Sequence, residues 1–203
     1  MRKVPSISTT RAAEIYKEML AYRRIYCADT EFFRMTDFWD WLCNGSGDWS
    51  VKLFESNLGD DYKKKAGVVA FEHLVTLTVD RELWDRASQR CRLANFILAH
   101  EIGHLALDHH AKNAVTKHFQ LFIGPRGMSN IPPTLEEMEA NLAAVFLQCG
   151  VALENVRWDA LDLANRACCD IEYVKRAQRF VRLDVFQKEL KRVSVSRYPR
   201  VVL

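Results

Sequence analysis

The sequence predicts an α+β domain in which a small antiparallel sheet is followed by buried helices and a helical C-terminal part. Three short segments at 49–55, 66–71 and 74–79 have the composition and spacing expected of strands. Only Glu72 and His73 separate the last two, which favours a hairpin and therefore antiparallel pairing. Elsewhere in the chain, apolar residues recur at helical spacing.

Helices are predicted before and after the three strands in the sequence. The spacing of apolar residues places them at 9–26, 35–44, 82–110 and 134–148, and over most of the chain after Arg157. Within 82–110 the stretch LANFILA is apolar on every side, and a helix of that composition is buried. Gly150 is a favoured stop residue for the helix over 134–148.

Length and composition predict one globular domain with short additions. The chain has 203 residues, of which 49% are hydrophobic and 27% charged, so a substantial core can form. The stretch NGSGD at 44–48 contains two glycines and marks the first boundary. We expect an N-terminal helical segment over 1–44, a core over 45–150 and a C-terminal helical region over 151–203.

The composition argues against several classes of protein. No apolar run approaches the roughly 18 residues of a membrane-spanning helix, and the first residues lack the apolar stretch of a secretory signal. The six cysteines show no Cys-x-x-Cys spacing, and Cys168 and Cys169 are adjacent. We therefore expect mostly buried free thiols in a reducing compartment, a cytoplasmic location and no membrane partner.

The strongest chemical signal is His100-Glu101-Ile-Gly-His104 on the predicted buried helix. Residues four apart lie on one helix face, so His100 and His104 can bind the same metal ion. Glu101 projects roughly 100° away from His100, where its carboxylate can take a proton from the attacking water and pass it to a leaving amine. Two buried histidines one turn apart are hard to satisfy by hydrogen bonds alone. The spacing therefore predicts a catalytic zinc site with Glu101 as the base.

A catalytic zinc site usually has three protein ligands, and the sequence offers alternatives for the third. His110 stands where the pattern His-Glu-x-x-His-x-x-Gly-x-x-His places its last histidine. In that pattern the glycine lets the chain turn back. Here Leu107 takes the place of that glycine and favours continuation of the helix, so His110 is the less favoured ligand.

An acid from the second buried helix is the favoured third ligand. On a helical wheel, Glu137, Asn141 and Gln148 form a narrow polar stripe on an otherwise apolar helix. We predict that Glu137 binds the metal and that Asn141 hydrogen-bonds to a ligand histidine. Glu139 is the rival ligand. Thr134-x-x-Glu137 also fits a capping box, in which the Glu137 side chain would reach back to a backbone N–H.

These two segments resemble the ImmA/IrrE family of metallopeptidases. The resemblance rests on FILAHEIGHL at 96–105 and EMEANLAA at 137–144. The corresponding family patterns are Phe-Thr-Leu-Ala-His-Glu-Leu-Gly-His and Glu-x-Glu-Ala-Asn/Asp-x-Phe-Ala. The resemblance implies a zincin-like domain of the gluzincin type, with zinc on His100, His104 and Glu137 and with Glu101 as the base. Family members are cytoplasmic, often lie on mobile elements, and are often paired with a helix-turn-helix repressor that they cleave or inactivate.

The C-terminal region adds a basic segment. Residues 161–183 have the cadence of a helix-turn-helix, in which Asp170 would cap the second helix. Lys175, Arg176 and Arg179 on that helix could contact DNA. The turn lacks the glycine that is common in this motif, so ordinary packing or protein docking is favoured over nucleic-acid binding.

Together these features predict a cytoplasmic zinc-dependent endopeptidase of regulatory type that acts on a specific protein, such as a helix-turn-helix repressor. The alternative is a zinc-containing regulatory protein that captures a partner or DNA without cutting it. A structural zinc site is normally closed by four protein ligands, and three ligands beside Glu101 favour the enzyme. Weaker candidates for contact with the substrate or the oxyanion are His109, His110, His118 and Tyr173.

Overall fold

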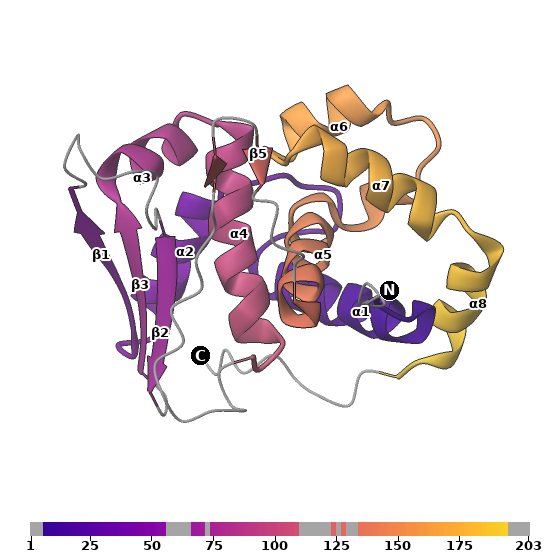
Figure 1. The fold of residues 1–203 in the computed structure, drawn as a ribbon, viewed down its shortest axis with the longest axis horizontal. Coiled ribbons are helices and arrows are strands. Elements are labelled where there is room, and N and C mark those ends of the chain that lie inside the picture. Colours follow the sequence, from indigo (N-terminus) through magenta and orange to yellow (C-terminus); the bar gives the residue numbers. More distant parts are fainter. Residues whose placement is uncertain are drawn as a thin grey trace.

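The computed structural model describes residues 6–55, 66–71, 74–109, 123–124, 127–128 and 134–194. Over these ranges the fold is α+β and mostly helical (Figure 1). The helices are α1 (Thr9–Tyr26), α2 (Met35–Gly45), α3 (Arg81–Ser88), α4 (Arg92–Ala106), α5 (Leu135–Cys149), α6 (Ala160–Arg166), α7 (Ile171–Val181) and α8 (Asp184–Arg192). The main strands are β1 (Trp49–Phe54), β2 (Ala66–Phe71) and β3 (Leu74–Asp80), and a short pair is formed by β4 (Ile123–Gly124) and β5 (Gly127–Met128).

The main sheet is mixed, whereas the sequence predicted an antiparallel one. Its strand order is β1-β3-β2, with β2 antiparallel to β3 and β1 parallel to β3 from the Trp49–Val75 pair to the Phe54–Asp80 pair. The predicted antiparallel pairing of β2 with β3 is present. If β1 had paired with β2, the two strands would have been antiparallel and the sheet would have been a meander. Strand β1 pairs instead with β3, and strand lengths alone do not reveal that choice.

The predicted helix over 82–110 is two helices, α3 and α4. The chain breaks between them because Arg90 adopts a left-handed conformation, with φ 67°, and the amide of Cys91 donates to the carbonyl of Arg86. The second helix also ends earlier than predicted, at Ala106. Leu107 does not continue it, because the chain turns at Asp108, where φ is 55°. Aspartate is one of the few residues that tolerates this conformation.

Helices α4 and α5 pack side by side, and a glycine sets how closely they approach. A Cβ atom added at Gly103 would lie 2.8 Å from the carbonyl oxygen of Ala140 and 3.1 Å from the Cβ of Ala143. Only small residues allow two helix backbones to come this near. The two helices that carry the predicted site residues are therefore in backbone contact at the level of the site.

The C-terminal end of α5 is held by a buried arginine from α1. Arg23 is fully buried and donates hydrogen bonds to the carbonyls of Leu147, Gln148 and Glu31. A cation is favourable there because the last carbonyls of a helix lack intrahelical donors and carry partial negative charge. Gly150 follows with φ 52°, and a Cβ atom there would lie 2.5 Å from Nε of Arg23. Helix α1 is thus fixed to α5.

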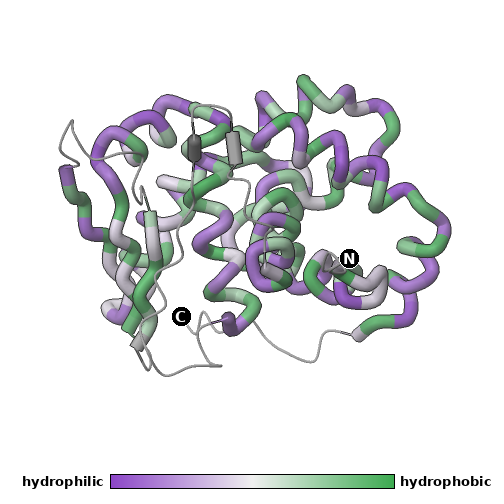
Figure 2. The backbone as a smooth tube through the Cα atoms, in the orientation of Figure 1, coloured by the Kyte–Doolittle hydropathy of each residue, from purple (hydrophilic) through white to green (hydrophobic). Residues whose placement is uncertain are grey.

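One hydrophobic core joins the three segments expected from the sequence. It contains Ile15 of α1, Leu77 of β3, Ile97 of α4, Phe146 of α5 and Phe186 of α8, all fully buried. Figure 2 shows hydrophilic and hydrophobic stretches alternating along the C-terminal helices, as expected of helices with one face on the core.

Two further findings concern the described residues as a set. None of the helices there combines the length and the apolar character needed to cross a membrane. All six cysteines are free thiols, as the sequence predicted, and three of them are buried: Cys149, Cys168 and Cys169.

Candidate metal centre

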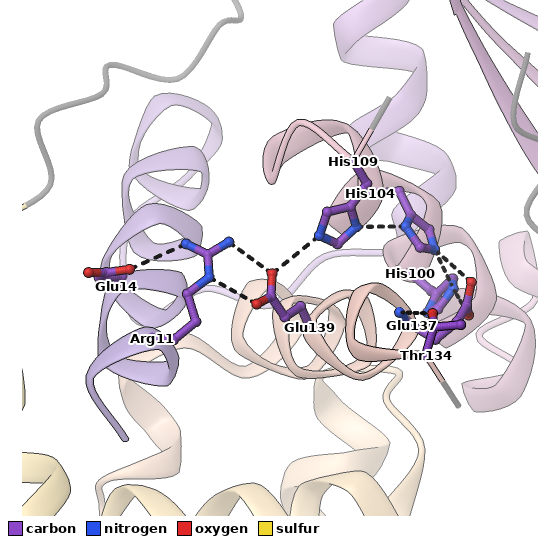
Figure 3. Close-up of polar contacts among 8 residues, drawn as sticks. All are labelled: Arg11, Glu14, His100, His104, His109, Thr134, Glu137 and Glu139. Carbon is purple, nitrogen blue, oxygen red and sulfur yellow. Dashed lines mark hydrogen bonds and ion pairs between the residues drawn. The ribbon is translucent and has the colours of Figure 1, made fainter. Parts of the chain in front are cut away.

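Three predicted ligands come together where α4 meets the first turn of α5. The Nε2 atoms of His100 and His104 lie 2.9 Å apart, and both imidazoles are buried. The carboxylate of Glu137 reaches both rings, with Oε2 at 3.2 Å from His100 Nε2 and Oε1 at 3.5 Å from His104 Nε2 (Figure 3). Among the described residues these three form a group whose ligand atoms all lie within 4.8 Å of one another, so they could hold a metal ion.

The placement of Glu137 bears on the capping-box alternative. Thr134 is the N-cap of α5, and its hydroxyl accepts a hydrogen bond from the backbone N–H of Glu137 at 3.2 Å. The carboxylate of Glu137 faces the two imidazoles, as Figure 3 shows. The residue therefore serves the cap through its backbone while its side chain joins the histidine pair.

Asn141, one turn after Glu137, determines which ring nitrogen of His100 carries the hydrogen. Its Oδ1 lies 3.0 Å from His100 Nδ1. An amide oxygen only accepts hydrogen bonds, so His100 Nδ1 carries the hydrogen and its Nε2 keeps a lone pair. That lone pair faces the centre of the group. This is the contact with a ligand histidine that the polar stripe of the sequence predicted for Asn141.

Glu139, the rival ligand, lies outside the group and faces α1. Its carboxylate accepts two hydrogen bonds from Arg11, from Nε at 3.1 Å and from Nη2 at 2.9 Å. Its Oε2 also lies 3.3 Å from Nε2 of His109. The alternative third ligand His110 lies outside the described residues, as do His73 and His118.

His109 is the neighbour of His104 on the side away from the group. The turn at Asp108 folds the chain back after α4, and His109 Nδ1 lies 2.8 Å from His104 Nδ1. His109 is 1% exposed, and its two ring nitrogens face His104 and Glu139. The contact between His109 and His104 could not be predicted from the sequence, because it depends on the left-handed conformation of Asp108, where the sequence predicted a helix.

The charge states of the group suit a cation. Burial lowers the pKa of His104 to about 3, so this imidazole is neutral at physiological pH. Burial alone would raise the pKa of Glu137, but its contacts with His100 and His104 outweigh burial and hold that pKa below its usual value. Glu137 is therefore an ionised carboxylate, and it faces the neutral ring of His104.

The donor set fits zinc. Imidazole nitrogens and carboxylate oxygens are common zinc ligands, with bond lengths of about 2.0–2.1 Å, which place two ligand atoms of a tetrahedral ion about 3.3 Å apart. The three distances between donor atoms, 2.9, 3.2 and 3.5 Å, bracket that value. Carboxylate and imidazole also suit other divalent ions, so the geometry supports a divalent metal and the donor types favour zinc.

Glu101 follows His100 on α4 and is fully buried. A carboxylate this far from bulk water interacts strongly with nearby charge and with proton donors. The ring of Tyr173, on α7, stacks on Phe96 of α4 with 4.4 Å between the ring centroids. Burial raises the pKa of Tyr173 to about 12, so its hydroxyl stays protonated.

The basic segment forms helices α6 and α7 with a tight turn between them. The turn contains no glycine, and Cys168 takes the left-handed conformation there, with φ 51°. Asp170 caps α7 as predicted and accepts hydrogen bonds from the backbone amides of Glu172 and Tyr173. The side chains of Lys175, Arg176 and Arg179 are exposed on α7.

Comparisons with protein-family models, with curated proteins and with solved structures found no match to this chain.

Proposed function

We propose that the protein is a zinc-dependent endopeptidase whose metal ligands are His100, His104 and Glu137. The observation that carries the proposal is the convergence of these three side chains, with Glu101 next to His100 on the same helix. Two ligands from α4 and one from α5, with no fourth among the described residues, are the arrangement expected of a catalytic rather than a structural zinc site.

The residues have separate tasks in peptide hydrolysis. A zinc ion supplies Lewis acidity toward the substrate carbonyl and makes a water molecule more acidic. Glu101 accepts the proton from the attacking water and delivers it to the amine that leaves. Asn141 holds His100 in the tautomer that presents Nε2 to the metal. The low pKa of Glu137 keeps its carboxylate charged, so it balances the charge of the cation.

The substrate and the setting are proposed from the resemblance to the ImmA/IrrE family. On that basis the domain is zincin-like and works in the cytoplasm, and its substrate is one specific protein, such as a helix-turn-helix repressor. The free cysteines agree with a reducing compartment. The exposed basic face of α7 offers a surface for such a protein, and DNA is the weaker alternative partner.

The test combines metal analysis with a cleavage assay. The purified chain should contain one zinc ion per molecule, measured by mass spectrometry. Incubated with the repressor encoded beside its own gene, it should release fragments that a gel resolves, and a chelator should stop the release. Glu101→Gln should keep the zinc and lose about 10²–10⁴-fold in rate, because only the proton acceptor is removed.

Each rival has its own signature in the same assay. Formation of a stable complex with the repressor, without fragments and without an effect of Glu101→Gln, would identify a protein that captures its partner. A gel shift with DNA that weakens steeply with salt would point to a DNA-binding regulator. A chain that neither carries nor takes up a divalent ion would contradict the proposal altogether.

A further inference from the structure

We propose that Arg11, Glu139 and His109 form a positioning chain that holds the His104 ring in the orientation and tautomer that bind metal. The inference rests on the metal centre proposed above, and it adds a requirement that the motif residues do not contain. It assigns the N-terminal helix α1 a part in metal binding, although none of the ligands lies on α1.

The chain of contacts is continuous from α1 to the ligand (Figure 3). Arg11 binds both carboxylate oxygens of Glu139, at 3.1 and 2.9 Å. Glu139 Oε2 lies 3.3 Å from His109 Nε2, and His109 Nδ1 lies 2.8 Å from His104 Nδ1. The last ring then presents its Nε2 to His100 and Glu137.

Donor and acceptor chemistry gives the chain one direction in the metal-bound protein. A neutral imidazole that binds metal through Nε2 carries its hydrogen on Nδ1, so His104 Nδ1 is a donor. His109 Nδ1 must therefore accept, which leaves the hydrogen of a neutral His109 on Nε2. That hydrogen points to Glu139, whose carboxylate can only accept and is held by the two N–H groups of Arg11. Every contact then pairs a donor with an acceptor.

Burial explains why this arrangement matters. His104 and His109 are 0% and 1% exposed, and the side chain of Glu139 is 10% exposed. An imidazole N–H that loses its acceptor in such a place is unfavourable, because water does not replace the partner. The opposite proton arrangement would place a hydrogen on His104 Nε2, and that nitrogen could then not bind a metal ion. Glu139 and Arg11 therefore favour the metal-binding form.

The two ligand histidines are held by different means. His100 is oriented by Asn141, which lies on α5 one turn from the ligand Glu137. His104 is oriented by a chain that begins at Arg11, 128 positions away from Glu139 in the sequence. Arg11 is also the partly exposed end of that chain, with a side chain that is 31% exposed and a second ion pair to Glu14 at 3.3 Å. Displacement of α1 would therefore move Arg11 and, through Glu139 and His109, change the orientation of the His104 ring.

The test measures metal affinity in the full-length protein by competition with a zinc chelator. Arg11→Ala and Glu139→Gln should each bind zinc about 10–100-fold more weakly than the wild type, the range found when the partner of a ligand histidine is removed. Arg11→Lys, which keeps the charge but not the two-pronged contact, should fall between the wild type and Arg11→Ala. Arg24→Ala is the matched control, because the exposed Arg24 lies on the same helix and pairs with Asp29. It should bind zinc as the wild type does.

A second readout separates positioning from a loss of stability. In ¹⁵N spectra of the histidine rings of the zinc-loaded protein, the wild type should show His104 protonated at Nδ1 and His109 protonated at Nε2. In Glu139→Gln the His109 signal should shift while the unfolding midpoint of the metal-free protein changes little. An altered midpoint with unaltered ring signals would mean that Arg11 and Glu139 serve packing alone.

The outcomes for the two proposals are distinct. A wild type that binds zinc, with Arg11→Ala and Glu139→Gln equal to it in affinity, overturns the positioning chain and leaves the peptidase standing. If the variants bind zinc more weakly than the wild type, and the wild type cleaves no protein, the positioning chain is supported and the peptidase proposal is overturned. A wild type that binds no divalent ion overturns both.

Discussion

Gly103 of α4 and Ala140 of α5 meet backbone to backbone, so that a Cβ atom at Gly103 would lie 2.8 Å from the carbonyl oxygen of Ala140. Gly103 precedes the proposed ligand His104, and Ala140 lies three residues, or about one turn, after the proposed ligand Glu137. The separation of the two helices at this point is therefore also the separation of the ligands they carry. A small residue between two motif histidines thus has a geometric purpose.

Gly103→Ala should destabilise the protein and weaken metal binding together. In an open helix this change would be favourable by about 1 kcal/mol, but here the added methyl group meets backbone atoms that cannot rotate away. We expect a loss of about 1–3 kcal/mol in the free energy of unfolding, measured by urea titration. Gly47→Ala is the control, because nothing lies within 4 Å of its added Cβ. Equal effects of the two changes would contradict the close approach.

The two acids of α5 should differ in how they affect the metal. Glu137→Ala removes a ligand, and we expect the purified protein to lose most of its zinc during gel filtration. Glu139→Ala leaves all three ligands in place, so the ion should remain at one per molecule when zinc is in excess. Mass spectrometry of both variants measures the difference. If both keep zinc equally well, the third ligand lies elsewhere in the chain.

Asn141→Ala should weaken zinc binding about 10–100-fold without removing the site, because His100 loses the acceptor that fixes its tautomer. Gln148→Ala is a suitable control on the same polar stripe. Its amide donates to the carbonyl of Cys168 at 2.8 Å, far along α5 from the ligands, so it should lower stability but not metal affinity. Chelator competition distinguishes the two. Similar affinities for Asn141→Ala and the wild type would show that the hydrogen bond is dispensable.

The metal-free protein should lose stability on acidification. Burial lowers the pKa of His104 to about 3, whereas a histidine in an unfolded chain titrates near 6.5. Between these values only the unfolded chain binds the proton. The contribution of the neutral His104 to the free energy of unfolding is therefore fully present above about pH 6.5, and it is progressively lost as pH falls toward about 3. Urea titrations of chelator-treated protein at about pH 7.5 and pH 5 measure the loss. His104→Gln should show a smaller pH dependence, and an unchanged one would refute this origin.

The sequence predicted which residues of α4 and α5 lie together, for a physical reason. Helical spacing alone places His100 and His104 on one face, and the polar stripe on an apolar helix singled out Glu137 and Asn141. The structure brings all four together. The two histidines lie within one helical turn of each other, and the polar stripe on an apolar helix has to face something polar. Both features follow directly from the order of residues.

The features that the sequence missed depend on tertiary context. The antiparallel sheet was wrong because the position of β1 depends on the edge it joins. The single helix over 82–110 was wrong because Arg90 and Asp108 take left-handed conformations that neither residue type announces. Arg11 gave no signal at all, since its partner Glu139 is remote in the chain. Each of these errors concerns a contact or a backbone angle that packing decides.

The location of Glu137 on a different helix from the two histidines has a consequence for folding. An ion bound by all three residues would be a cross-link between distant parts of the chain, and in the unfolded ensemble that cross-link is absent. Its binding energy would then add to the stability of the native state in proportion to the logarithm of the free zinc concentration. The availability of zinc in the surroundings would thereby set how long the molecule survives, as well as whether it is active.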